Sequence, residues 1–151
     1  MKQLLLLLTL IVTSHAGSAQ IVNIPDTNFK QALIDAGVDA NGDGNIQFAE
    51  AEMVEVLQVG NKEISSIEGI DAFVNLKDLG CGRNPNLQEI NLNKNTKLER
   101  LWCAHCTYIQ SLDLSNNPFL KVLDCGFNTI DYIDIKSNLA LEKLVYTACK
   151  L

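Results

Sequence analysis

The stretch that decides the fold is Leu101 to Leu120, LWCAHCTYIQSLDLSNNPFL, because the chain on both sides of it repeats the same pattern. Apolar residues recur in five columns at intervals of 21 or 22 residues. The columns are Leu76, Leu98, Leu120 and Leu141; Leu79, Leu101, Leu123 and Leu144; Cys81, Cys103, Cys125 and Tyr146; Ile90, Leu112 and Ile133; and Leu92, Leu114 and Ile135. A period of about 22 residues predicts a solenoid in which each repeat is one coil.

Each coil is predicted to contain two short extended runs. Apolar residues two positions apart, such as Leu101 and Cys103 or Leu112 and Leu114, point the same way only in an extended chain. Neither run can bury its apolar face alone, so the coils must stack in parallel register at about 4.8 Å. A coil of this length has no room for a long helix. We therefore expect a mainly β solenoid.

Two further columns are polar and follow the same period. One contains Asn84, Cys106, Asn128 and Cys149, and the other contains Asn95, Asn117 and Asn138. Buried turns leave backbone groups that need hydrogen-bond partners, and an asparagine amide supplies one acceptor and two donors. The columns predict asparagine ladders inside the turns.

The repeat resembles a known family at this point. The pattern LxxLxCxxNxLxxLDLSxN, seen as LERLWCAHCTYIQSLDLSNN at 98–117 and as LKVLDCGFNTIDYIDIKSN at 120–138, is similar to short leucine-rich repeats of Bacteroidetes surface proteins. The resemblance covers about Val54 to Leu151, and it departs from the family at Cys106 and Cys149, where the family has asparagine. It implies a leucine-rich-repeat solenoid used in adhesion or recognition.

The beginning of the chain indicates export. Met1 to Ala19 has one lysine, an apolar run from Leu4 to Val12, and small residues before Gln20, as in a cleavable signal peptide. The apolar run is too short for a membrane span, which needs about 20 residues. We expect a signal peptide at 1–19, a helical cap at 20–53, and repeats with an incomplete last coil at 54–151. The expected location is secreted or on the cell surface, without a transmembrane segment.

The segment at 39–50, DANGDGNIQFAE, matches the EF-hand calcium loop D-x-[DN]-x-[DN]-G-x5-E at every specified position. Calcium prefers six to eight oxygen ligands. The predicted ligands are Asp39, Asn41, Asp43, the carbonyl of Asn45, Gln47 and Glu50. Helices are expected on both sides, from Asp26 to near Gly37 and from Phe48 to Leu57. Ca²⁺ is therefore the expected cofactor, and the alternative is a turn without metal.

The cysteines and the histidine favour structure over chemistry. Cys81, Cys103 and Cys125 occupy an apolar column, which predicts buried free thiols, with a disulfide within the column or a zinc or redox site as alternatives. His105 has no serine and acid spaced for a catalytic triad. The formal charge of −6 disfavours nucleic acid. We expect no enzymatic activity.

The side chains between the inward columns are the binding candidates. Trp102 and Phe127 are predicted to lie on one face in adjacent coils, near Arg83 and His105. Aromatic and arginine side chains dominate interface energetics. The alternative is that these residues only cover a small core.

These features predict a secreted or cell-surface protein-interaction module with an EF-hand-like calcium cap. Its partner would be an extracellular protein or glycan. An accessory or remnant domain of a larger secreted protein or enzyme is the alternative. The chain stops within a coil, so we also expect a fragment or self-association through the open C-terminal coil.

Overall fold

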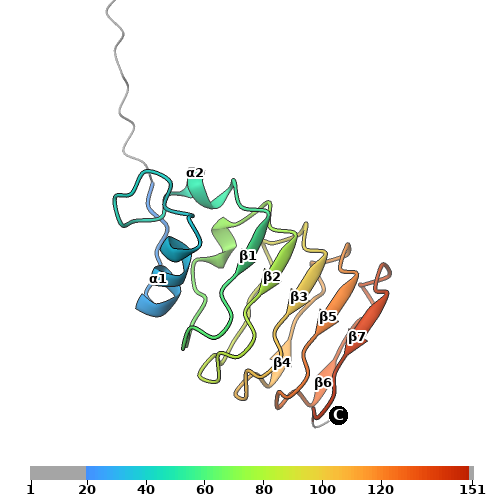
Figure 1. The fold of residues 1–151 in the computed structure, drawn as a ribbon. Coiled ribbons are helices and arrows are strands. Elements are labelled where there is room, and N and C mark those ends of the chain that lie inside the picture. The colour runs from blue at the N-terminus through green and yellow to red at the C-terminus, as the bar shows by residue number, and fades with distance from the viewer. Residues whose placement is uncertain (1–19, 150–151) are drawn as a thin grey trace, which may run out of the picture.

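The computed structural model describes residues 20–149, and the expected signal peptide at 1–19 lies outside the described residues. Five parallel strands stack side by side along the molecule (Figure 1). They are β1 (Val56–Gln58), β2 (Asp78–Gly80), β3 (Arg100–Trp102), β5 (Val122–Asp124) and β7 (Lys143–Val145), hydrogen-bonded in that order. The solenoid fold predicted from the sequence is confirmed.

The strand register follows the sequence period. Leu57 pairs with Leu79, which pairs with Leu101, and the column continues through Leu123 to Leu144. The first four are buried and Leu144 is half-buried. Each coil therefore adds the same leucine to one continuous core, which no single coil could form.

The second side of the solenoid is also extended, as predicted. There β4 (Ser111–Leu112) pairs in parallel with β6 (Tyr132–Ile133), behind the larger sheet in Figure 1. A single bridge from Asn91 to Asp113 continues this pairing toward the N-terminus. A 3-10 helix, η1 (Ile70–Ala72), occupies this side in the lead-in coil. Within residues 20–149 no helix is long and apolar enough to cross a membrane.

Two helices close the N-terminal end of the solenoid (Figure 1). Helix α1 (Thr27–Asp35) begins just after Asp26, as predicted. The Asp26 side chain caps the helix by accepting a hydrogen bond from the Phe29 amide at 2.8 Å. Helix α2 (Phe48–Ala51) has only four residues, so the prediction of a helix to Leu57 is wrong. Leu57 belongs to the leucine column of the solenoid. Its pairing with Leu79 in the next coil requires an extended chain at Leu57 in place of a helix.

The predicted asparagine ladders form. In one ladder the amide groups of Asn95, Asn117 and Asn138 each donate to two carbonyls in the preceding coil. Their side-chain oxygens have no hydrogen-bond partner, so this ladder uses the donors and not the acceptor. In the other ladder the Cys106 and Cys149 thiols point at the carbonyls of Cys81 and Cys125, at 3.5 and 3.2 Å, which is the role of the amide nitrogen in the asparagines.

The five cysteines are unpaired thiols in this structure. Burial raises the pKa of Cys81 and Cys103, and it raises the pKa of Cys125 to about 12. These three side chains are therefore thiols at neutral pH. Metal binding and disulfide exchange need the thiolate form, so burial disfavours both. The geometry agrees with the buried-thiol interpretation.

Candidate functional site

A groove runs across the outer face of the main sheet and encloses about 340 Å³. Four small residues from successive coils line it, namely Gly60, Gly82, Ala104 and Gly126. A methyl group added at Gly82 would lie 2.8 Å from the Ala104 carbonyl oxygen, so the coils approach too closely there for a larger side chain. We call this hollow the sheet groove.

One side of the sheet groove is a column of residues in the left-handed backbone conformation. Asn61, Arg83, His105, Phe127 and Ala148 follow one another at the coil interval, with φ between 57° and 61°. Asparagine and histidine are enriched in this conformation, whereas bulkier side chains there are uncommon. The chain nevertheless has arginine and phenylalanine at two of the three central positions, on either side of His105. Strained positions that persist are often functional.

The aromatic residues of the groove contact their neighbours along the coil axis. The rings of His105 and Phe127 stack with centroids 4.3 Å apart and an interplanar angle of 5°. Trp102 lies on β3, and the Lys143 amino group of β7 is 6.0 Å from the centre of its ring. Phe127 remains 47% exposed. The prediction that Trp102 and Phe127 share one face is confirmed, because both line the same groove.

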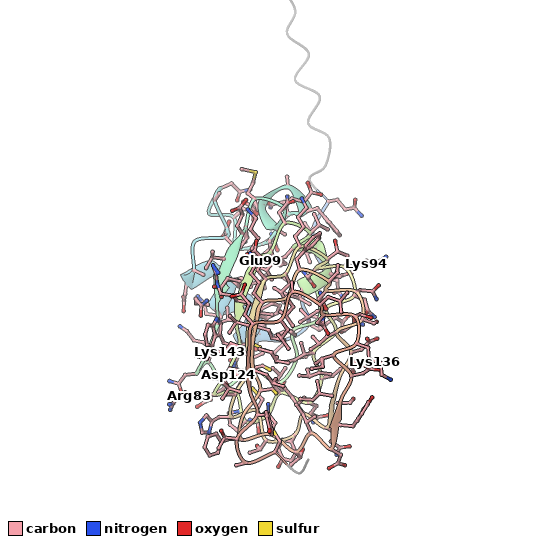
Figure 2. The ribbon with its side chains drawn as sticks, turned by 90° about the vertical axis from the view of Figure 1, so that its right-hand side faces the viewer. Arg83, Lys94, Glu99, Asp124, Lys136 and Lys143 are labelled. Atoms are coloured by element: carbon pink, nitrogen blue, oxygen red, sulfur yellow. The ribbon has the colours of Figure 1, made fainter. Side chains whose placement is uncertain are left out.

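Two charged residues near the groove, Asp124 and Lys143, were not among the predicted binding candidates. Asp124 lines the groove and accepts a hydrogen bond from the Gly126 amide at 3.2 Å. Figure 2 shows Arg83, Asp124 and Lys143 on one side of the molecule, and Lys94 and Lys136 on the other. Asp124 occupies the Trp102 position in the next coil, and the period could have identified it.

The predicted calcium loop is held in shape by hydrogen bonds from its own side chains. Asp39 accepts hydrogen bonds from the amides of Gly42, Asp43 and Gly44 at 2.8 to 3.2 Å. The side-chain amides of Asn41 and Gln47 donate to the Asp43 carboxylate at 3.2 and 2.8 Å. The side chains at three predicted ligand positions are therefore linked to one another, and the Asp39 carboxylate holds the loop backbone.

The ligand set fits a hard cation in chemistry. The hydrogen bond from the Asn45 amide, with others from Asn41 and Gln47, lowers the pKa of Asp43 and so favours its ionised form. A half-turn of the Asn41 or Gln47 amide would replace its N–H donors by an oxygen. The Asn45 side chain, by contrast, accepts from the Lys30 amino group at 3.3 Å and leaves only its carbonyl as a predicted ligand.

Glu50, the last predicted ligand, closes the loop. Its carboxylate accepts from the Gln47 amide at 2.9 Å as part of a capping box on α2, and from the amides of Ala40 and Asn41 at 2.9 and 3.3 Å. Across residues 20–149, no three His, Cys, Asp or Glu side chains are grouped closely enough to hold a metal on their own. The loop would depend on amide and carbonyl oxygens as well.

A segment outside the loop supplies a pairing strand. EF-hand loops usually occur in pairs, and the sequence of this chain contains one match to the loop motif. Here the Val22 amide donates to the Ile46 carbonyl at 2.8 Å, and the Phe48 amide donates to the Gln20 carbonyl at 2.9 Å. Residues 20–22 thus pair with the end of the predicted calcium loop, and Ile46 is fully buried.

The opposite side of the solenoid has a larger cleft of about 730 Å³, lined by polar residues that include Asn91, Tyr108 and Asp113. The Asp113 carboxylate accepts from the amide and hydroxyl of Ser115, and the Asn91 oxygen accepts from the Asn93 amide. These side chains therefore hold their own turns.

The comparisons show a shared fold. An internalin, InlF, of Listeria monocytogenes superposes with a TM-score of 0.66 at 18% identity, over 91% of this chain and 48% of the InlF chain. The internalin C2 of the same species superposes with a TM-score of 0.58 at 19% identity, over 86% of this chain and 69% of its own. This chain spans about half the length of the InlF structure. No protein-family model matches the sequence, and no curated protein matches it.

Proposed function

We propose that this protein is a secreted or cell-surface binding module whose sheet groove contacts an extracellular partner. One observation carries the proposal: three left-handed turn positions in successive coils hold Arg83, His105 and Phe127, which line one groove together with Trp102. Buried positions would explain such residues by packing, but these side chains are exposed or half-exposed. Exposed arginine and aromatic side chains held at left-handed turn positions favour a binding role.

The fold supports the same proposal. Leucine-rich-repeat solenoids present an extended face built from many coils, and this chain has the fold of the internalins. Location outside the cytoplasm rests on the signal-peptide pattern at 1–19. No pair of side chains in the groove forms a nucleophile and base, so binding explains the site better than catalysis.

We further propose that the cap holds calcium through the side chains of Asp39, Asn41, Asp43, Gln47 and Glu50 and the carbonyl of Asn45. Calcium would supply no reaction there. It would offset the repulsion among three carboxylates that the sequence places within one twelve-residue loop. Because α2 leads directly into β1, the loop acts on the first coil of the solenoid.

The test is capture of extracellular partners by the chain from Gln20 onward. Surface proteins and glycans of neighbouring cells are passed over immobilised wild type, the double variant Trp102→Ala with Phe127→Ala, and Tyr108→Ala. We expect bound material on wild type and Tyr108→Ala and little on the double variant. Tyr108 is a matched control because it is 59% exposed on the opposite side. Equal binding by all three would reject the sheet groove as the binding surface.

The alternative is an accessory or remnant domain of a larger secreted protein or enzyme, with no binding role of its own. In that case the same capture would recover nothing on any variant, although each is folded. The two functions are therefore separated by one experiment.

A further inference from the structure

The size of the sheet groove favours a small ligand. Five strands about 4.8 Å apart and three residues long, at about 3.3 Å per residue, form a face of roughly 19 by 10 Å, or about 200 Å². A standard protein interface buries about 800 Å² on each partner. The groove volume of about 340 Å³ instead lies at the lower end of small-ligand pockets.

The groove also lacks the geometry for an extended peptide that adds a strand. Strand addition needs a free sheet edge, where backbone donors and acceptors are unpaired. The groove crosses the middle of the sheet, where β2, β3 and β5 are paired on both sides. A ligand there must be recognised by side chains and by ring surfaces.

Charge and ring surfaces define the ligand chemistry. Among residues 20–149, neither Arg83 nor Lys143 has a carboxylate within 4.0 Å. Arg83 lines the groove, and the Lys143 amino group is 6.0 Å from the centre of the Trp102 ring. An arginine guanidinium pairs with a carboxylate through two parallel hydrogen bonds. Asp124 and Gln58 line the same groove and can bond to hydroxyl groups. Trp102 offers a flat apolar surface.

We propose that the sheet groove binds a carboxylate-bearing saccharide one or two rings long. Trp102 contacts the apolar face of a sugar ring, Arg83 pairs with the carboxylate, and Asp124 accepts from hydroxyl groups. The stacked rings of His105 and Phe127 close the side of the groove. This inference rests on the proposed function of the sheet groove and names its ligand class.

The chain contains its own fluorescent reporter of ligand binding. Trp102 is the only tryptophan in the sequence, so its fluorescence reports the groove directly. The probes are digalacturonate, its neutral counterpart digalactose, and an acidic tetrapeptide, each titrated to millimolar concentration. We expect digalacturonate to shift the Trp102 emission. Digalactose should bind at least roughly tenfold more weakly, as expected for loss of the charge-assisted pairing with Arg83.

Three variants test the individual contacts. Two of the substitutions are chosen from residues that other coils already have at the same left-handed position. Arg83→Asn introduces the residue found at Asn61, and it should abolish the preference for digalacturonate. Phe127→Ala introduces the residue found at Ala148, and it should weaken both saccharides. Tyr108→Ala should change neither. Circular dichroism melting confirms that each variant is folded.

Equal binding of the two disaccharides by wild type, or no emission change with either, would overturn the inference. Tetrapeptide binding as tight as digalacturonate, with the same dependence on Arg83, would also overturn it, because the groove would then recognise any carboxylate. If the saccharides fail while partner capture still requires Trp102 and Phe127, the proposed function stands and only the ligand class is wrong.

Discussion

At the scale of single residues, Asp26 joins the cap to the solenoid. One carboxylate oxygen caps α1 through the Phe29 amide at 2.8 Å. The other accepts from the Ser65 amide, the Ser65 hydroxyl and the Ser66 amide at 2.8, 2.6 and 2.9 Å. One side chain thus satisfies donors that are about 40 residues away in sequence.

Asp26→Ala should lower the free energy of unfolding by about 2 kcal/mol, about half from the helix cap and half from the lost contacts with Ser65 and Ser66. Asp26→Ser is the matched variant, because serine keeps the cap but cannot reach the second site, so about half the loss should remain. Urea unfolding measures both. A change below about 0.5 kcal/mol for Asp26→Ala would contradict this role, since that is the range of ordinary surface substitutions.

The same carboxylate has a defined pH dependence. Burial raises the pKa of Asp26, but the hydrogen bonds from Ser65, Phe29 and Ser66 outweigh this effect, and the net pKa is below 3.8. A carboxylate with a lowered folded pKa contributes stability that is complete above its ordinary pKa. The Asp26 contribution is therefore lost only as the pH falls through the lower folded value.

At the scale of elements, a charge ladder runs beside the strands. Residues just before each strand alternate in sign along the coils, in the series Glu55, Lys77, Glu99, Lys121 and Glu142. Lys77 bonds to Glu55 at 2.9 Å and Lys121 bonds to Glu99 at 2.7 Å. The hydrogen bond from Lys121 lowers the pKa of Glu99. A shift of one coil would place like charges together, so the ladder favours the observed stacking.

Glu99→Lys should lower the melting temperature at low salt, because three lysines would then stand on adjacent coils. About 0.5 M salt should recover most of the loss, since screening acts strongly on exposed charges. Glu99→Gln removes the attraction to Lys121 without adding a repulsive charge, so it should lower the melting temperature less than Glu99→Lys does. A melting loss that is independent of salt would point to packing instead.

At the scale of the whole molecule, the calcium loop should stabilise every coil. Calcium at about 2 mM, with a dissociation constant of about 0.1 to 1 mM, adds roughly 0.6 to 1.8 kcal/mol. That corresponds to a rise of about 2 to 6 °C in melting temperature for a domain of this size. Asn75 bonds to the Glu52 carbonyl at 2.7 Å, so cap and solenoid should unfold in one transition.

The measurement is thermal unfolding with calcium and with chelator. Glu50→Gln should abolish most of the rise, because glutamine keeps the capping acceptor on α2 but loses the charge and the two-oxygen ligand. Glu52→Gln removes an equal charge just outside the loop and should respond as wild type. Identical melting of wild type in the two buffers would reduce the segment at 39–50 to an ordinary turn.

Side-chain spacing determined most of the fold. Local intervals fix which residues share a face, so the leucine columns, the asparagine ladders and the Asp26 cap of α1 could all be predicted. The shared face of Trp102 and Phe127 followed from the same phase. The length of α2 could not be predicted in this way, because the pairing of β1 with the next coil ends the helix.

The contacts of the candidate site were decided only by the tertiary structure. The stacking of His105 on Phe127, the position of Lys143 above Trp102, and the pairing of residues 20–22 with the calcium loop all join segments 20 or more residues apart. Such contacts depend on coil register and on the left-handed turns, which direct side chains across coils. The local sequence pattern determines on which face of the solenoid a residue lies, and the stacking of the coils determines which residues it contacts.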